Sequence, residues 1–142
     1  MIVVTGSDGG SENAKQIAKQ FAQHGCLAVA VGYWGLKGVS LALSEIPLEY
    51  ISSAIAWIKA FGGPRIQSIA GYGLSKGAEF LLSAACRYHD LDAVIALVPN
   101  DFVCEGIQRS IPLYTGASSW TYEGQPLPFT RLRFLLGTFL RR

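Results

Sequence analysis

Residues 66–88, Ile66-Gln-Ser-Ile-Ala-Gly71-Tyr-Gly-Leu-Ser75-Lys-Gly77-Ala-Glu-Phe-Leu-Leu-Ser-Ala-Ala-Cys-Arg-Tyr88, decide the fold. An apolar, β-prone segment over 66–71 enters a turn that carries the pattern G-x-S-x-G, and a run with helical spacing follows it. This order is what a nucleophile elbow requires, in which a sharp bend between a strand and a helix exposes the central serine. The stretch therefore predicts a strand, a strained turn over 72–77 and a helix that continues to Tyr88.

The elbow hypothesis assigns a role to each residue of the turn. Ser75 is the candidate nucleophile, and Gly73 and Gly77 are the small residues that the tight bend needs on either side of it. The backbone N–H of Lys76, near the positive end of the helix dipole, is a candidate donor to an oxyanion. An ordinary glycine-rich turn between a strand and a helix is the alternative.

Composition limits the possible classes of protein. The chain has 142 residues, of which half are hydrophobic and 15% are charged, with a net charge of +2. These values favour one α/β domain with a buried sheet and argue against a disordered chain or a nucleic-acid-binding protein. No apolar run approaches the roughly 20 residues that span a bilayer, and the apolar N-terminus lacks the basic region of a signal peptide. We therefore expect neither a nucleic-acid partner nor an integral membrane segment.

The cysteines and histidines show no cofactor or metal pattern. Cys26, Cys86 and Cys104 are odd in number and widely spaced, which fits neither a disulfide framework nor a C-x-x-C site. We interpret them as buried or partly buried thiols in a reducing compartment, by default the cytoplasm. The glycine-rich loop 6–10 lacks G-x-G-x-x-G, which argues against a dinucleotide site.

The remaining chain extends the pattern to β-α-β-α-β-α-β. We expect strands over 2–5, 27–31 and 93–98 in addition to 66–71, a helix capped by Ser11 and ended by Gly25, and a helix that begins at Pro47. Such alternation predicts a parallel sheet of about four strands flanked by helices, with the fully apolar segment 27–31 as a central strand. Residues 100–128 look like a long surface excursion. The basic and apolar tail 130–142 suits a membrane-surface helix, a short structural helix or a truncated end.

Several blocks of this sequence resemble one known family. Residues 72–79, Tyr-Gly-Leu-Ser-Lys-Gly-Ala-Glu, are similar to the nucleophile region of the acyl-CoA thioesterase and bile-acid-CoA:amino-acid N-acyltransferase family, α/β hydrolases related to dienelactone hydrolase. Further similar blocks, in consistent order, are 6–10, 45–50, 98–99, 102–106 and 118–128. The likeness covers Ile2 to Phe129 and implies a partial α/β-hydrolase domain over 1–129.

The resemblance implies an activity. Ser75 would attack the thioester carbonyl of an acyl-CoA or related ester, and backbone N–H groups of Lys76 and of the loop at Asp8 and Gly9 would form the oxyanion hole. Acyltransferase members carry cysteine at the nucleophile position, so serine favours the hydrolase branch. The side chain of Lys76 is either a partner for coenzyme A phosphates or a solvated lysine. Three aromatic residues either line an acyl pocket or pack the interior, namely Tyr33, Trp34 and Trp120.

The family pattern is incomplete here. In α/β hydrolases the triad acid and histidine follow the serine in the chain, and this sequence ends before either is expected. His24 and His89 suit surface roles, Asp8 suits a loop, and Asp101 would have no histidine to orient. We therefore expect a fragment whose partner is the missing remainder of the hydrolase domain, and whose activity is absent or impaired. The alternatives are a catalytically dead remnant and an acyl-CoA:amino acid N-acyltransferase.

Overall fold

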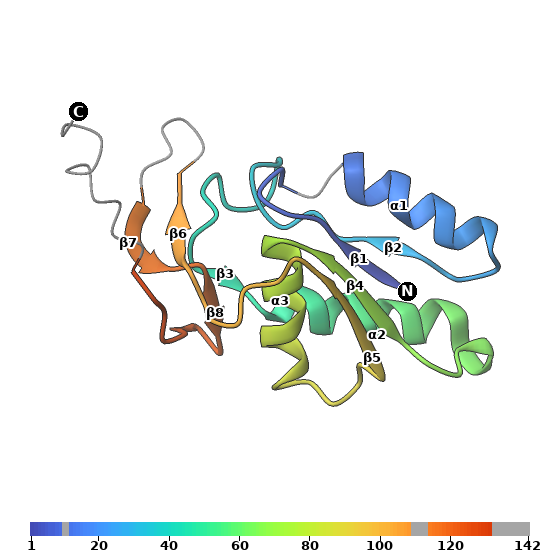
Figure 1. The fold of residues 1–142 in the computed structure, drawn as a ribbon. Coiled ribbons are helices and arrows are strands. Elements are labelled where there is room, and N and C mark those ends of the chain that lie inside the picture. Colours follow the sequence, from blue (N-terminus) through green and yellow to red (C-terminus); the bar gives the residue numbers. More distant parts are fainter. Residues whose placement is uncertain (10–11, 109–113, 132–142) are drawn as a thin grey trace.

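A four-stranded parallel sheet forms the centre of the fold (Figure 1). The computed structural model describes residues 1–9, 12–108 and 114–131. In spatial order the strands of this sheet are β2 (Val29–Ala30), β1 (Ile2–Val4), β4 (Ala70–Leu74) and β5 (Ala93–Leu97). Every neighbouring pair is parallel, so each connection between them must cross over the sheet. The predicted α/β class with a parallel four-stranded sheet is confirmed.

Helices cover the two faces of this sheet unequally. Because right-handed crossovers place a helix on the face set by the direction of travel, the connection from β1 to β2 lies on one face and the next two lie on the other. Accordingly, α1 (Glu12–Gln23) packs on one face, and α2 (Glu49–Gly62) and α3 (Lys76–Ala85) pack on the opposite face (Figure 1). A short 3-10 helix, η1 (Gly63–Arg65), follows α2.

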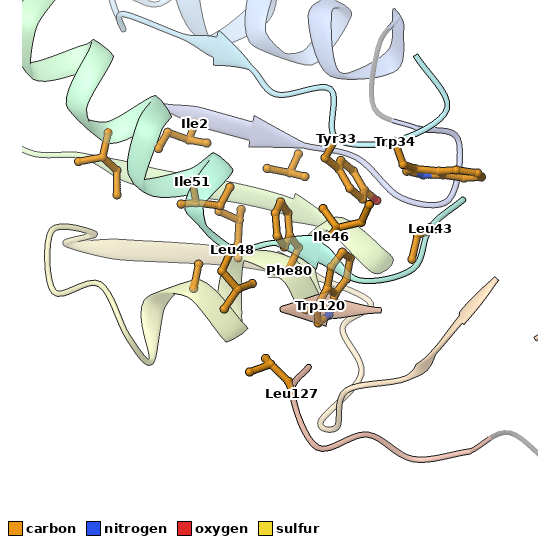
Figure 2. Close-up of a cluster of buried hydrophobic side chains, with 14 of the residues drawn as sticks. Ile2, Tyr33, Trp34, Leu43, Ile46, Leu48, Ile51, Phe80, Trp120 and Leu127 are labelled. Atoms are coloured by element: carbon orange, nitrogen blue, oxygen red, sulfur yellow. The ribbon is translucent and has the colours of Figure 1, made fainter. Parts of the chain in front are cut away.

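The core forms where the predicted apolar helix faces meet the sheet. On α2, the residues at helical spacing that the sequence singles out are at most 3% exposed, namely Ile51, Ile55 and Ile58. Figure 2 shows the aromatic centre of this cluster, where the rings of Tyr33, Trp120 and Phe80 of α3 all contact one another. The ring centroids are 5.2 Å apart for Tyr33 and Phe80 and 4.6 Å apart for Phe80 and Trp120. Of the three aromatic residues singled out in the sequence, Tyr33 and Trp120 are fully buried and Trp34 is 4% exposed, so all three belong to the core.

The region after β5 is more ordered than a surface excursion. It contributes two small sheets beyond the carboxyl end of the main sheet (Figure 1). One joins β3 (Ile46–Pro47) to β8 (Trp120–Tyr122) and β9 (Gln125–Pro126), and the other pairs β6 (Glu105–Ile107) with β7 (Tyr114–Ser118). Trp120 is fully buried, so the expectation that 100–128 is a surface excursion is wrong.

Four element boundaries also differ from expectation. The helix predicted to continue to Tyr88 is α3, which ends at Ala85. The strand expected over 66–71 is β4, which begins only at Ala70 and runs to Leu74, directly before Ser75. Segment 27–31 contains a strand of only two residues at the edge of the sheet, and not a central strand. Pro47 belongs to β3, whose pairing with β8 fixes it in extended backbone, and α2 begins only at Glu49. The predicted cap at Ser11 and the tail from 132 onward lie outside the described residues.

Among the described helices, none combines the length and apolar character needed to cross a bilayer.

Candidate active site at the carboxyl ends of β1 and β4

The strand order places a topological switch point between β1 and β4. The chain leaves β1 for β2 on one side and then returns to β4 on the other side of β1, so the direction of winding reverses between β1 and β4. In open α/β sheets, ligands bind at such a switch point, outside the carboxyl ends of the strands. A functional site is therefore expected among the residues that follow β1 and β4.

Ser75 follows β4 directly and has the backbone conformation of a sharp elbow. Its φ is 53° and its ψ is −119°, a region that L-residues other than glycine rarely occupy, at a cost of about 1–3 kcal/mol. The residue is exposed, and its hydroxyl makes no capping hydrogen bond to α3. Its own N–H donates to the Leu97 carbonyl of β5 at 2.9 Å. A strained, exposed serine at a strand-to-helix bend is the geometry that presents a nucleophile to a ligand.

The two flanking glycines have no room for a side chain. A Cβ on Gly73 would lie 2.5 Å from the Ala78 Cα, inside the first turn of α3. A Cβ on Gly77 would collide with the carbonyl oxygens of Val4 and Thr5, at the end of β1. Because the obstacles are backbone atoms, only glycine lets α3 start this close to β4 and β1.

The loop after β1 lies against Ser75. A Cβ placed on Gly6 would be 3.6 Å from the Ser75 Oγ, so this glycine backbone adjoins the hydroxyl. The Tyr33 hydroxyl lies 2.7 Å from the Gly6 carbonyl oxygen and 3.0 Å from that of Thr5, and its proton can serve one of them at a time. Burial, followed by the carboxylates of Asp8 and Glu79, raises the pKa of Tyr33 well above its ordinary value, so the phenol stays protonated as a donor. The sequence singled out this loop but did not identify Gly6 as its contact with the serine.

Asp8 and Gly9, the predicted second oxyanion donors, lie on the same loop. The Asp8 carboxylate accepts hydrogen bonds from Thr5 Oγ1 at 2.9 Å and Asn13 Nδ2 at 2.8 Å, so its side chain shapes the loop. Gly9 has a φ of 83°, and a Cβ there would lie 2.7 Å from the Trp34 carbonyl oxygen. Together with Ser7 and Trp34, the two residues line a cavity of about 360 Å³. The contact with Ser75 itself is made by Gly6, and Gly10 lies outside the described residues.

The side chain of Lys76 is buried, which corrects both expectations for it. The residue is 9% exposed, and its Nζ donates to Glu79 Oε1 at 2.9 Å and to Ser119 Oγ at 2.7 Å. It is therefore neither a solvated lysine nor a partner for coenzyme A phosphates. Its backbone N–H, as the first of the helix, has no intrahelical acceptor and stays a candidate oxyanion donor.

Both histidines lie toward the amino ends of the strands, whereas Ser75 lies at the carboxyl end of β4. Helices that connect parallel strands run back toward the amino ends of the strands, and His24 follows α1 while His89 follows α3. His24 is also engaged locally, with its Nδ1 2.8 Å from the Gln20 carbonyl oxygen. Asp101 follows β5 at the carboxyl end and is exposed. In the described part of the chain, Ser75 thus has no imidazole beside it.

The described residues show no metal site beside the serine. Those residues contain no cluster of three or more histidine, cysteine or acidic side chains suited to a metal ion. Cys26 and Cys86 are exposed free thiols, which corrects the expectation that they are buried, whereas Cys104 is buried. Burial raises the pKa of the Cys104 thiol, and the nearby Lys76 ammonium offsets part of that effect.

Comparison with protein-family models and with curated protein sequences gave no significant match.

Proposed function

We propose that this chain carries the nucleophile and oxyanion-binding part of an acyl-thioester hydrolase, with a partial α/β-hydrolase fold, Ser75 as the acylated residue and acyl-CoA or a related ester as the substrate. One observation carries the proposal: Ser75 is exposed in an elbow conformation at the start of α3, beside the loop after β1. The strand order supports it as well, because this position is the switch point of the sheet. The three unpaired cysteines suit a cytoplasmic setting.

The proposed chemistry follows from the arrangement. Ser75 Oγ attacks the thioester carbonyl carbon, and the electron pair of the C=O bond moves onto oxygen. The N–H of Lys76 and an N–H of the Asp8–Gly9 loop stabilise this oxyanion. The C=O bond re-forms as the C–S bond breaks, and the sulfur leaves as a thiol with the proton that Ser75 has given up. Water then hydrolyses the acyl-serine ester, which releases the carboxylic acid and restores the Ser75 hydroxyl. Serine needs a base to take its proton, so with no imidazole near Ser75 in the described residues we expect acylation and turnover to be slow.

Covalent labelling tests the nucleophile directly. We expect an alkyl fluorophosphonate to label the full-length chain at Ser75, as identified by mass spectrometry of the modified peptide. Ser75→Ala should abolish the label. Ser83→Ala is the matched control, because Ser83 lies on the same helix two turns away and should leave labelling intact. An unlabelled wild-type chain, or a label on another serine, would contradict the proposal.

A second function is favoured by the position of the histidines. Because His24 and His89 lie at the opposite end of the sheet, the chain could bind acyl ligands without turning them over. A non-hydrolysable thioether analogue of an acyl-CoA would then bind, while the thioester releases no thiol. Adding glycine to the thioester assay also identifies the acceptor, since an N-acylglycine product would indicate transfer to an amine in place of hydrolysis.

A further inference from the structure

The proposed chemistry leaves one deeply buried carboxylate without a role. Glu79 is 2% exposed and lies on the first turn of α3. Its Oε1 accepts hydrogen bonds from Lys76 Nζ at 2.9 Å, Trp120 Nε1 at 2.8 Å and the Cys104 N–H at 2.9 Å. Its Oε2 accepts from Lys76 Nζ and Asn100 Nδ2, both at 3.0 Å. Its acceptor sites are thus fully used.

The donors come from three separate parts of the chain. Lys76 belongs to α3, Asn100 and Cys104 follow β5, and Trp120 belongs to β8. The Lys76 ammonium also donates to Ser119 Oγ, which in turn donates to the Cys104 carbonyl at 2.8 Å. The network therefore joins the first turn of α3 to both neighbouring segments at the carboxyl end of the sheet.

The same turn closes on Ser75 through the backbone. The N–H of Glu79 donates to the Ser75 carbonyl at 3.1 Å, and the N–H of Ala78 donates to it at 2.9 Å. Residues 75–79 are thus held at the backbone by Ser75 and at the side chains by Glu79. Lys76 lies within this turn, so one residue supplies the candidate oxyanion N–H and the ammonium that Glu79 binds.

We infer that Glu79 is a positioning residue of the Ser75 site: through Lys76 it fixes the first turn of α3, and with it the direction of the Lys76 N–H and the Ser75 hydroxyl. This inference rests on the proposed function. A donor displaced by about 1 Å from a developing oxyanion can lower a rate about 100-fold, so a fixed first turn matters to acylation. A role in stability alone would leave the rate at Ser75 unchanged in a folded variant.

The experiment measures the fluorophosphonate reaction in two parts, the inhibitor affinity KI and the maximal rate kinact, well below the unfolding midpoint of every variant. In Glu79→Gln the amide can still accept from Trp120 and Cys104, but the Lys76 ammonium loses its counter-charge. We expect kinact to fall about 10- to 100-fold with KI nearly unchanged. Glu105→Gln is the matched control, because Glu105 is also a buried carboxylate (6% exposed) but lies on β6, and its kinact should equal that of the wild type.

A milder variant keeps the test available if Glu79→Gln does not fold. Ser119→Ala removes one acceptor of Lys76 Nζ and preserves the ion pair, so a smaller loss of kinact in the same direction is expected. An unchanged kinact in the folded variant, or an equal loss in Glu105→Gln, would overturn the inference while the proposed function stands.

Amide hydrogen exchange gives an answer even if the wild-type chain is unreactive, the outcome that contradicts the proposed function. The amides of Ala78 and Glu79 report on the turn, because both donate to the Ser75 carbonyl. In Glu79→Gln they should exchange faster, whereas the amides of β4 should not change. If the amides of the turn and of β4 exchange faster to the same extent, or if exchange at Ala78 and Glu79 does not change, Glu79 does not hold this turn.

Discussion

Both faces of the four-stranded sheet carry apolar side chains, but they are covered to different extents. On one face, Ile2 and Val4 are fully buried beneath α2 and α3. On the other face, one row of paired residues crosses the sheet from β1 to β5, namely Val3, Tyr72 and Ile95. Val3 is fully buried beneath α1, Tyr72 is half-buried against Phe21, and Ile95 is 45% exposed. Cover on this face therefore ends between β1 and β5, because α1 packs on β1 and β2 and reaches β4 at the contact between Phe21 and Tyr72.

The candidate site lies at the boundary between the covered and the open parts. Ser75 follows β4, with the buried strand β1 on one side and β5 on the other. Toward β1 the elbow is packed against backbone at Gly77, and toward β5 it is held by the hydrogen bond from the Ser75 N–H to Leu97. Changes on the covered side should therefore affect the fold far more than equivalent changes on the open side.

The largest expected effect is at Gly77. In Gly77→Ala the new Cβ would collide with the Val4 and Thr5 carbonyls, so α3 would have to move off β1. We expect a loss of about 3 kcal/mol or more in the free energy of unfolding, measured by urea titration. Gly25→Ala is the control, because nothing lies within 4 Å of its Cβ position, so the substitution carries only the backbone cost of its φ of 85°. It should lose only about 1 kcal/mol, and equal losses at both sites would contradict the close packing of α3 on β1.

The next comparison uses one substitution on both faces. Ile2→Ala removes a fully buried side chain and should reduce the free energy of unfolding by about 2–5 kcal/mol. Ile95→Ala removes a side chain that is 45% exposed in the folded chain, and should reduce it by about 1 kcal/mol. Chemical denaturation of both variants measures the difference. Similar losses would mean that the open face is covered in solution.

Elements set by local sequence were predictable, because their signals lie within one stretch. The apolar spacing of Ile51, Ile55 and Ile58 predicts the buried face of α2, and the order of strand, turn and helix predicts the elbow at Ser75. Burial of a strand is not local. The run Ala93–Leu97 is apolar throughout, yet its exposure depends on which elements lie beside it.

The parts that the sequence did not reveal depend on distant contacts. Strands β3, β8 and β9 have only two or three residues, too few for a periodic pattern, and the burial of Trp120 depends on pairing between β3 and β8. At the site, Lys76 and Glu79 are three residues apart, a spacing usual for a solvated pair. They are buried because Ser119 and Trp120, more than 40 positions later, close over them. The sequence shows Gly77-Ala78-Glu79 directly after Lys76, but no local feature indicates that the Glu79 carboxylate is a buried hydrogen-bond acceptor.

Alkaline pH should affect the covered face through Tyr33. Burial raises the pKa of this phenol in the folded chain, whereas the unfolded chain loses the proton near pH 10. Above that pH the unfolded state binds fewer protons, so this group lowers stability by about 1.4 kcal/mol per pH unit. Tyr33→Phe loses the hydroxyl's hydrogen bond and cannot ionise. Its free energy of unfolding should therefore lie below that of the wild type by a constant amount between about pH 7 and 9, and this difference should shrink between about pH 10 and 11. A constant gap throughout would mean that the phenol ionises in the folded state.

The smallest effect on stability, and the most direct test of the open face, is expected for Ile95→Lys. Strand β5 is an edge of the main sheet in the described structure, with no charge or proline within it, and edge strands of this kind pair readily with other chains. A lysine at Ile95 should change the free energy of unfolding by less than about 1 kcal/mol, because its long stem can lie along the surface. It should nevertheless lower concentration-dependent self-association, measured by sedimentation velocity. Gln16→Lys adds the same charge on the exposed side of α1 and is the control. Self-association that falls equally in both variants would indicate an effect of net charge. A fall in Ile95→Lys alone would show that chains associate through the uncovered strand β5.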